Sequence, residues 1–318
     1  VEDVRTQVRD IEIRKTKGVA GSISLKMAWK IMQENNVVTI PSVREDGALE
    51  GLITVGDITK TYMNIYDSSI LSKANTQYSN IIETLEGAIF VGDEKAYFDK
   101  GKVLIAAANP DMMEYYIEKN DLVILGNRYE SQLCAIEMDA SCLVICQGAN
   151  ISKTIKKMAE ERDIVIIQTP HDTFTAARLI NQSIPVKYFM SRDNLEIFHL
   201  NDYVEHVKEV MSKTKYRDFP ILDNKGKFCG FLSRRRLMTS RKKQVILVDH
   251  NEKSQAVNGI EEAEVQEIID HHRLGGLETI GPVYFRNQPV GCTATIVYQM
   301  YQEEGVEVEP VIASLLCS

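Results

Sequence analysis

Two segments of the chain repeat one another at a shift of 179 positions, and this repeat constrains the fold more than any other feature of the sequence. Apolar, proline and glycine positions coincide in the two copies without a gap: Leu25 with Val204, Pro41 with Pro220, and Gly51 with Gly230. A repeated segment of this kind is one structural unit. A unit this small cannot cover both faces of its own sheet, so we expect the copies, at residues 1–66 and 184–241, to pack on each other.

Each copy predicts the element order helix, strand, strand, helix. Leu25, Ala28 and Met32 recur at helical spacing behind Ser24, a residue type that caps helices. Strands at 37–40 and 49–54 flank the Asp46-Gly turn signal, and a helix follows from about residue 56. The second copy repeats this order with a helix at 204–211, strands at 219–222 and 228–232, and a helix from about residue 234.

The second strand of each copy ends in groups suited to a nucleotide. Gly-Leu-Ile-Thr54-Val-Gly-Asp57 and Gly-Phe-Leu-Ser233-Arg-Arg-Arg236 resemble the CBS domain, a module that works in pairs and often binds adenine nucleotides between its copies. The resemblance implies that the hydroxyl of Thr54 or Ser233 meets phosphate and that Asp57 bonds the ribose hydroxyls. A hydroxyl beside the free N–H groups of a helix start suits phosphate, and a carboxylate accepts two hydroxyl protons.

The second copy has Arg236 where the first has Asp57. The arginines at 234–236 could hold polyphosphate, because guanidinium groups pair well with phosphate. The alternative is a solvated basic turn. We therefore predict that a regulatory adenine nucleotide binds through Thr54, Asp57, Ser233, Arg234 and Arg236. Whether AMP, ADP, ATP or a diadenosine polyphosphate is the regulator stays open.

Residues 80–183, between the repeats, alternate strand and helix signals. Strand-like runs lie at 88–91, 103–106, 122–125, 141–146 and 164–168, and helix-like stretches at 111–118, 131–137 and 152–161. This alternation predicts an α/β layer with a largely parallel sheet. Asn127-Arg128 and Cys146-Gln-Gly148 resemble the DRTGG domain, a module inserted between CBS copies, where it contributes to dimer contacts. Asn-Pro110-Asp reads as a turn before a helix rather than a metal-binding loop.

From residue 243 onward, two apolar strands each end in acidic and imidazole groups. The run at 245–248 ends in Asp249-His-Asn, and the run at 265–269 ends in Asp270-His271-His272. In open α/β sheets, ligands bind beyond the carboxyl ends of parallel strands. Asp249 and His271 are 22 positions apart, which leaves room for a crossover helix at 252–264. We therefore expect their side chains to lie side by side.

The motifs Val-Ile-Leu-Val-Asp249-His-Asn, Ile-Ile-Asp270-His271-His272-Arg and Pro289-Val-Gly-Cys-Thr-Ala-Thr resemble the DHH phosphoesterase superfamily and, within it, the family II inorganic pyrophosphatases. The resemblance implies that Asp249 and His271 bind metal. It also implies that His272 faces substrate phosphate, while Asp270 orients an imidazole. A His-His pair after a strand could otherwise be no more than a capped turn.

Carboxylate and imidazole ligands suit Mn²⁺, with Co²⁺ or Mg²⁺ as alternatives. The resemblance implies a manganese-dependent diphosphatase that hydrolyses inorganic pyrophosphate to two orthophosphates by a two-metal mechanism. Adenine nucleotide would regulate it by favouring one packing of the CBS pair. The expected fold is α/β with α+β CBS modules: a CBS pair, an inserted DRTGG α/β domain, and a partial DHH parallel-sheet domain at 243–318.

Several ligands that this family needs are missing from the sequence. No His-x-x-x-Asp-x-Asp motif occurs in residues 1–60, and the first residue is Val1 rather than Met. We therefore expect a fragment that folds at least through Arg241 but does not hydrolyse pyrophosphate by itself. Two alternatives remain: a nucleotide-sensing CBS module with an inactive DHH remnant, and a DHH-family oligoribonuclease, which would need a basic groove for RNA.

Composition limits the partners. The formal net charge of −8 argues against nucleic-acid binding, and the sequence has no apolar run of about 18 residues that would predict a membrane span. The six cysteines lack the spacing of zinc or redox motifs, which favours reduced thiols in a cytoplasmic protein. Because paired CBS modules usually associate, we expect a homodimer.

Overall fold

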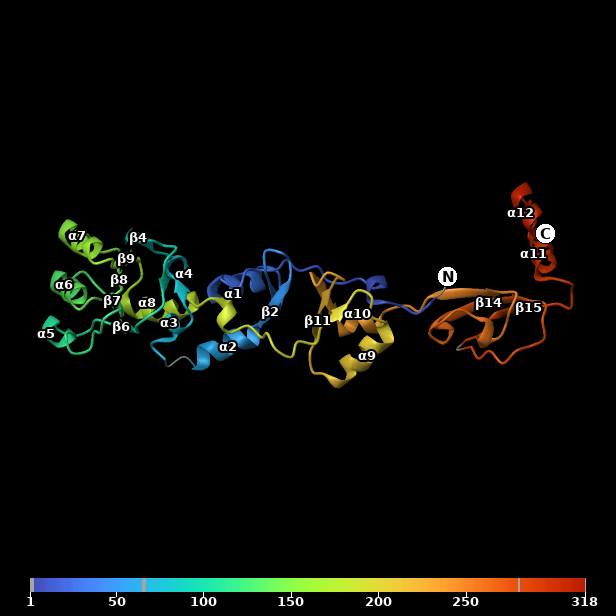
Figure 1. Cartoon of the computed structure of the whole chain (residues 1–318), viewed down its shortest axis with the longest axis horizontal. Coiled ribbons are helices and arrows are strands. Elements are labelled where there is room, and N and C mark those ends of the chain that lie inside the picture. Colours follow the sequence, from blue (N-terminus) through green and yellow to red (C-terminus); the bar gives the residue numbers. More distant parts are fainter. Residues whose placement is uncertain (1–2, 65–66, 280, 318) are drawn as a thin grey trace. The chain divides into compact units, whose positions relative to one another are not determined.

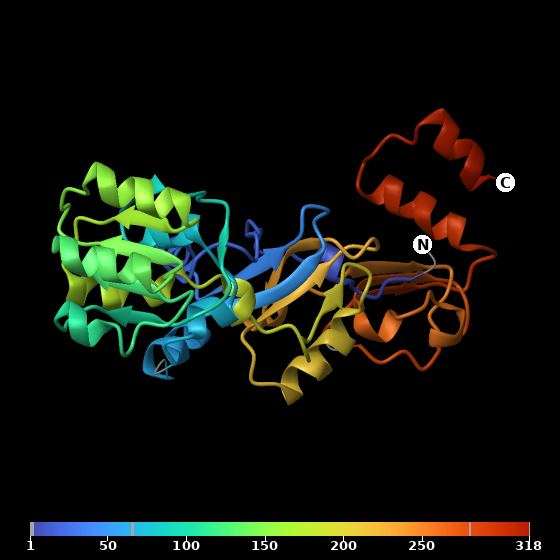
Figure 2. The same cartoon turned by 60° about the vertical axis from the view of Figure 1, so that its left-hand side comes forward.

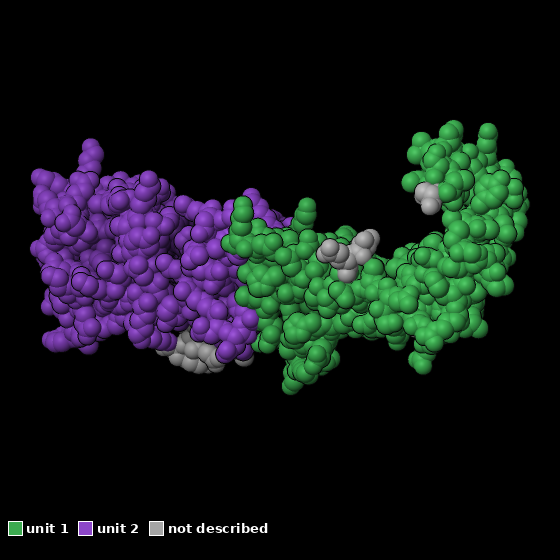
Figure 3. All heavy atoms as spheres, turned by 45° about the vertical axis from the view of Figure 1, so that its right-hand side comes forward, with its two compact units in different colours: residues 1–15, 196–225, 229–318 green, residues 16–195, 226–228 purple. Residues whose placement is uncertain are grey.

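The computed structural model describes residues 3–64, 67–279 and 281–317. Its elements are shown in Figure 1, and it divides into the two compact units coloured in Figure 3. Unit 1 comprises residues 1–15, 196–225 and 229–318, and unit 2 comprises residues 16–195 and 226–228. Helices alternate with strands along the chain; the larger sheets are parallel or mixed and the two-stranded sheets are antiparallel, which confirms the predicted α/β class.

The two copies of the repeat contain the same elements at the predicted shift. In unit 2 these are α1 (Leu25–Glu34), β1 (Thr39–Val43) and β2 (Leu49–Thr54). Their counterparts are α9 (Val204–Lys213), β11 (Asp218–Leu222) and β12 (Phe228–Ser233). Burial repeats as well, because each of the four strands has three consecutive buried residues at matching positions. The second strand of each copy leads directly into a helix, α2 (Val55–Asn64) or α10 (Arg234–Met238).

Helix α1 begins where its sequence predicts. The Ser24 hydroxyl accepts a hydrogen bond from the Met27 N–H at 3.0 Å and so caps the first turn. Leu25, Ala28 and Met32 are buried on one face. They belong to a single hydrophobic core that is formed jointly by the first repeat copy and the central sheet of unit 2.

The central sheet of unit 2 has five strands in the order β4-β9-β8-β7-β6. The strands are β4 (Ala88–Val91), β6 (Val103–Ile105), β7 (Leu122–Leu125), β8 (Cys142–Ile145) and β9 (Val165–Gln168). Strands β6 to β9 are mutually parallel, and β4 is antiparallel to β9 at the edge. The predicted, largely parallel sheet is therefore confirmed.

Both faces of this sheet are covered, as Figures 1 and 2 show. Val123 and Leu143 point into a core beneath α6 (Tyr129–Glu137) and α7 (Lys153–Glu161). The alternate residues Leu122 and Val144 point into the opposite core, which includes residues of α4 (Tyr78–Thr84) and α8 (Thr173–Leu179). Strands buried on both faces are continuously apolar, which explains why β7 and β8 read as unbroken hydrophobic runs. The remaining short elements of this region are α3 (Ile70–Lys73), β3 (Thr76–Gln77) and β5 (Tyr97–Phe98).

The helix expected at 111–118 is much shorter than predicted. Pro110 is the first residue of α5 (Pro110–Met113), in keeping with the predicted turn at Asn109. Beyond α5 the N–H groups of Tyr115 and Tyr116 donate three residues back, as in tight turns. The Glu118 N–H then bonds the carboxylate of Asp121 at 2.9 Å, which ends the segment.

The last part of unit 1 contains a parallel sheet in the order β13-β14-β15. Its strands are β13 (Gln244–Val248), β14 (Glu264–Asp270) and β15 (Tyr284–Asn287), followed by α11 (Thr293–Glu303) and α12 (Pro310–Leu316). Val248 pairs with Ile269, so β13 and β14 are neighbours that end together, as expected. Strand β15 was not predicted from the sequence; it pairs in parallel with β14 on the side opposite β13.

The prediction of a crossover helix at 252–264 is wrong. The segment between β13 and β14 contains two short 3₁₀ turns, Lys253–Gln255 and Ile260–Glu262. Gly259 has a φ of 81°, a left-handed conformation that interrupts a right-handed helix. In addition, the Asn258 carbonyl accepts a hydrogen bond from the Val4 N–H at 2.9 Å, outside any helix.

The N-terminal segment, residues 3–15, belongs to unit 1, although the first repeat was expected to begin at residue 1. Val4 lies in the core of the β13-β14-β15 sheet with Leu247 and Ile268. Val8 lies in the core of the second repeat with Val207 and Phe219. This short stretch therefore contributes to both cores of unit 1. Among the described residues, no helix has the length and apolar character needed to cross a bilayer.

Candidate metal centre

Asp249 directly follows β13 at the carboxyl edge of the sheet. Its backbone N–H donates to the Ile269 carbonyl at 2.9 Å, which holds the residue against β14. Its φ of 69° lies in the left-handed region, where aspartate is more common than most residues. The chain turns sharply at this position, and the carboxylate is 61% exposed. The carboxylate is thus available to a ligand at the edge of the sheet.

Asp270 ends β14 and is completely buried. It accepts hydrogen bonds from the backbone N–H of His271 (2.7 Å), from His272 Nδ1 (2.7 Å) and from Asn251 Nδ2. Burial raises the pKa of Asp270, but these hydrogen bonds, that of His272 foremost, outweigh burial and leave the pKa below its ordinary value. An ionised carboxylate therefore organises the two histidines that follow it.

Asp249, His271 and His272 each offer a ligand atom, and these atoms lie within 4.8 Å of one another. His271 Nε2 is 3.5 Å from Asp249 Oδ1. Two ligands about 2.1 Å from one ion, at right angles, are roughly 3 Å apart, so this pair is near the spacing that a shared ion needs. Carboxylate and imidazole are donors that suit Mn²⁺ or Co²⁺, and the residues present fit such an ion.

The proton positions of both imidazoles follow from their partners. His271 Nδ1 is 3.0 Å from the Val290 carbonyl, and His272 Nδ1 is 2.7 Å from the Asp270 carboxylate. Both partners can only accept, so each ring carries its proton on Nδ1. The lone pair of each Nε2 is then available to a metal or a substrate.

Two residues near the cluster, Asn251 and Thr293, lie inside the sequence motifs but were not predicted to have a role in the site. Asn251, which is buried, bonds Asp270 and the Arg273 carbonyl (3.0 Å), and so ties the end of β13 to the loop after β14. Thr293, the first residue of α11, donates its hydroxyl to Asp249 Oδ1 at 2.6 Å. The only sequence signal for either residue was its position inside a motif. Beside them, Cys292 has a lowered pKa, mainly because of a hydrogen bond with the Thr295 hydroxyl.

The two residues of the first copy that were predicted to bind nucleotide, Thr54 and Asp57, form hydrogen bonds with each other. The Thr54 hydroxyl donates to Asp57 Oδ2 at 2.7 Å, and the Asp57 N–H donates back to the hydroxyl at 3.1 Å. The Thr54 N–H also donates to Asp57 Oδ2 at 2.9 Å. This reciprocal pair caps the first turn of α2. Both residues therefore have a structural role at the helix start, whether or not they also bind a nucleotide.

The predicted ligands of the second copy lie in unit 1. Ser233 accepts a hydrogen bond from the Arg236 N–H at 3.4 Å and caps α10. Arg234 bonds the carbonyls of Tyr216 (Nε, 2.8 Å) and Thr214. The Arg236 guanidinium donates to the backbone carbonyl of Glu12 (3.0 Å) and forms an ion pair with the Glu12 carboxylate (3.2 Å). Both guanidinium groups are therefore engaged within the protein, and their role toward phosphate stays a prediction.

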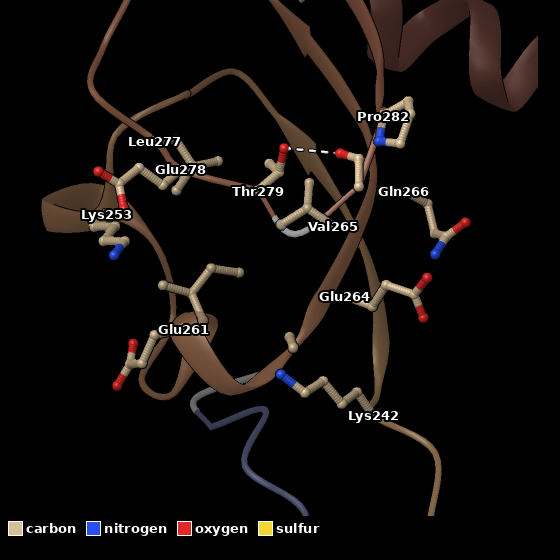
Figure 4. Close-up of a pocket in the computed structure, with 13 residues that line it drawn as sticks. Lys242, Lys253, Glu261, Glu264, Val265, Gln266, Leu277, Glu278, Thr279 and Pro282 are labelled. Atoms are coloured by element: carbon tan, nitrogen blue, oxygen red, sulfur yellow. Dashed lines mark hydrogen bonds between the residues drawn. The ribbon is translucent and has the colours of Figure 1, made fainter.

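A separate hollow lies at the opposite, amino end of β14, as Figure 4 shows. It has a volume of about 330 Å³, and Glu264 and Val265 form part of its wall. Lys242, Lys253 and Glu261 also line it, so charges of both signs are mixed there. Ligand sites in parallel sheets lie at the carboxyl ends of strands, which favours the Asp249 cluster over this hollow.

The chain matches two domain families and is similar to known inorganic pyrophosphatases. The CBS domain model matches residues 8–64 and 186–243, and the DRTGG domain model matches residues 80–183. The cobalt-dependent inorganic pyrophosphatase of Clostridium perfringens is 43% identical over all 318 residues. The probable manganese-dependent inorganic pyrophosphatase of Thermotoga maritima is 33% identical over the same span. The chain covers 58% of the length of each of these two proteins.

One solved structure is similar over most of the chain. It contains the CBS and DRTGG domains of the regulatory region of the Clostridium perfringens pyrophosphatase, complexed with its activator diadenosine tetraphosphate. It is 40% identical, with a TM-score of 0.70, and the match covers 72% of this chain and 100% of that one.

Proposed function

We propose that this chain, which belongs to the inorganic pyrophosphatase family, is the regulatory region and part of the catalytic centre of a metal-dependent inorganic pyrophosphatase. In this family the regulatory region combines CBS and DRTGG domains, and both domains are present in the chain. The reaction is hydrolysis of pyrophosphate to two orthophosphates. The observation that carries the proposal is the convergence of ligand atoms from Asp249, His271 and His272 within 4.8 Å. The family resemblance and the ligand chemistry point to the same reaction.

Each residue of the cluster has a role that its geometry supports. Asp249 Oδ1 and His271 Nε2, which lie 3.5 Å apart, would hold the metal. His272 is half exposed, and its hydrogen bond to Asp270 keeps the ring proton on Nδ1. Its Nε2 would therefore be free to contact substrate phosphate. When bound, Mn²⁺ or Co²⁺ lowers the pKa of water and neutralises phosphate oxygens. Asp270 keeps the orientation of the two rings.

Adenine nucleotide regulates the reaction in this proposal. Diadenosine tetraphosphate activates the Clostridium perfringens relative, whose regulatory region is 40% identical to this chain. Thr54 and Asp57 of the first copy, and Ser233, Arg234 and Arg236 of the second, are the ligands we propose. A nucleotide can shift the enzyme only by its difference in affinity for two packings. We further propose a cytoplasmic homodimer.

The decisive experiment is phosphate release from pyrophosphate by the natural full-length protein with Mn²⁺ or Co²⁺. We expect turnover that is lost in Asp249→Asn, and a change in turnover on addition of diadenosine tetraphosphate. Nucleotide binding without hydrolysis under these conditions would instead identify a sensor with an inactive remnant. Cleavage of a dinucleotide RNA but not of pyrophosphate would identify an oligoribonuclease.

A further inference from the structure

The two proposed metal ligands are both held by one short segment that follows β15 and ends at the first residue of α11. The Val290 carbonyl accepts from His271 Nδ1 at 3.0 Å, and the Thr293 hydroxyl donates to Asp249 Oδ1 at 2.6 Å. We propose that the segment Val290–Thr293 is a positioning element for the metal ligands and that the Thr293 hydroxyl fixes the rotamer of Asp249. This inference rests on the proposed metal centre and adds a residue to it.

Asp249 needs such a partner because little else restrains its side chain. Its backbone is fixed by the hydrogen bond to Ile269, but its carboxylate is 61% exposed. An exposed side chain loses conformational freedom when it binds a metal, and that loss opposes binding. A hydrogen bond that already selects the ligating rotamer reduces this cost. With its first oxygen engaged at 2.6 Å, the carboxylate still has lone pairs for a metal.

Thr293 is built to hold that position. It is 5% exposed, so its hydroxyl cannot exchange its partner freely with water. It begins α11, an eleven-residue helix whose Ile296 is also buried. The rigid helix therefore places the hydroxyl, rather than a mobile loop. Partners of metal ligands typically contribute 10- to 100-fold to metal affinity.

The same segment fixes His271 by its main chain. The bond to the Val290 carbonyl requires the proton on Nδ1 and directs Nε2 toward Asp249. The segment is anchored to the sheet, because the Gln288 N–H donates to the Asp270 carbonyl at 3.2 Å and the Val290 N–H to the Gln288 carbonyl at 2.8 Å. A displacement of this segment would therefore move both ligands together.

The test compares three substitutions in the natural full-length protein by calorimetric titration with Mn²⁺ and with Co²⁺. Thr293→Val keeps the shape but removes the hydroxyl, and we expect about 10- to 100-fold weaker metal binding. Thr293→Ser restores the hydroxyl and should restore affinity. Thr59→Val is the matched control, because Thr59 is an exposed threonine of α2 whose hydroxyl donates to the Val55 carbonyl of the same helix; it should bind metal as the unsubstituted protein does.

Thermal unfolding of the metal-free variants separates positioning from folding. We expect Thr293→Val to lower metal affinity while its metal-free midpoint stays within a few degrees of that of Thr293→Ser. Unchanged metal affinity in Thr293→Val would overturn the positioning role and leave the metal centre standing. If the unsubstituted protein bound neither ion, the metal centre itself would be wrong, and this inference with it.

Discussion

Arg5 lies over the ring of Tyr203, with its guanidinium carbon 3.9 Å from the ring centroid. The same guanidinium donates to the Tyr203 hydroxyl at 2.9 Å and to Asp3 at 2.6 Å, and the Tyr203 hydroxyl donates to Asp3 at 3.0 Å. Three residues thus form a closed set of contacts between the first residues of the chain and the start of α9. Val4 and Val8, on either side of Arg5, enter the two cores of unit 1.

Loss of this set should loosen the N-terminal segment. In Arg5→Ala we expect faster amide exchange at Val4 and Val8, whose N–H groups bond the carbonyls of Asn258 and Asp202. Arg9→Ala removes an exposed arginine from the same segment and serves as the control. Equal exchange in the two variants would show that Arg5 does not hold the segment in place.

The contact should also weaken in acid. The hydrogen bond from Arg5 holds the pKa of Asp3 well below its ordinary value. A carboxylate with a depressed pKa in the folded state stabilises that state above its unfolded pKa of about 4, and the contribution is lost as pH falls toward the folded value. We expect the protection of the Val4 amide to decline below about pH 4, and Asp3→Asn to remove this pH dependence.

Both histidines after β14 should be protonated on Nδ1 in the metal-free protein when they are neutral. Long-range ¹H–¹⁵N spectra distinguish the two tautomers directly. We expect this tautomer for His271 because of the Val290 carbonyl and for His272 because of Asp270. A proton on Nε2 of His271 would contradict the arrangement, since that nitrogen could not then bind a metal.

Asp270→Asn should damage the centre without removing a metal ligand. The carboxylate accepts hydrogen bonds from Asn251, His271 and His272 with two oxygens, whereas an amide has only one accepting oxygen. At least one of these donors would therefore lose its hydrogen bond. Breaking a buried, charged network typically costs roughly 3–5 kcal/mol. Chemical denaturation should show this loss, and the Nδ1 tautomer of His272 should no longer dominate in the spectra. His250→Asn, a neighbouring substitution outside the network, is the control.

Thr54 can be tested separately as a cap and as a nucleotide ligand. Thr54→Ala removes the reciprocal bonds with Asp57 and should cost about 1 kcal/mol of unfolding free energy. Ser152→Ala removes the comparable cap of α7 and should cost a similar amount. If Thr54 binds phosphate, only Thr54→Ala should also weaken binding of diadenosine tetraphosphate in a calorimetric titration. Equal affinity in the two variants would confine Thr54 to its structural role.

The parts of the fold that could be predicted are those with a local or repeated signal. The repeat located α1, β1 and β2 and their counterparts, and the apolar runs located β7 and β8, because both faces of these strands are buried. The carboxyl ends of β13 and β14 were also correctly expected to lie together. The prediction of a crossover helix was wrong because Gly259 has a left-handed backbone conformation and the Asn258 carbonyl bonds the distant Val4 N–H instead of a helical partner.

Side-chain partners across the candidate site could not be predicted in the same way. Thr293 meets Asp249 from 44 positions away, and His271 meets a main-chain carbonyl that has no sequence signature. Such pairs depend on where β15 and α11 place their ends. A motif can therefore supply the chemical groups of a site, but the contacts that orient them need the three-dimensional structure.

Unit 1 is discontinuous in sequence, because residues 1–15 join partners that begin at residue 196, whereas unit 2 is almost one uninterrupted stretch. During synthesis, the nascent chain can therefore complete most of unit 2 while the partners of Val4 and Val8 have not yet left the ribosome. Val4 and Val8 would therefore be synthesised long before the residues that bury them. In this order of synthesis, Val4 and Val8 remain without their core partners until most of the described chain has been made.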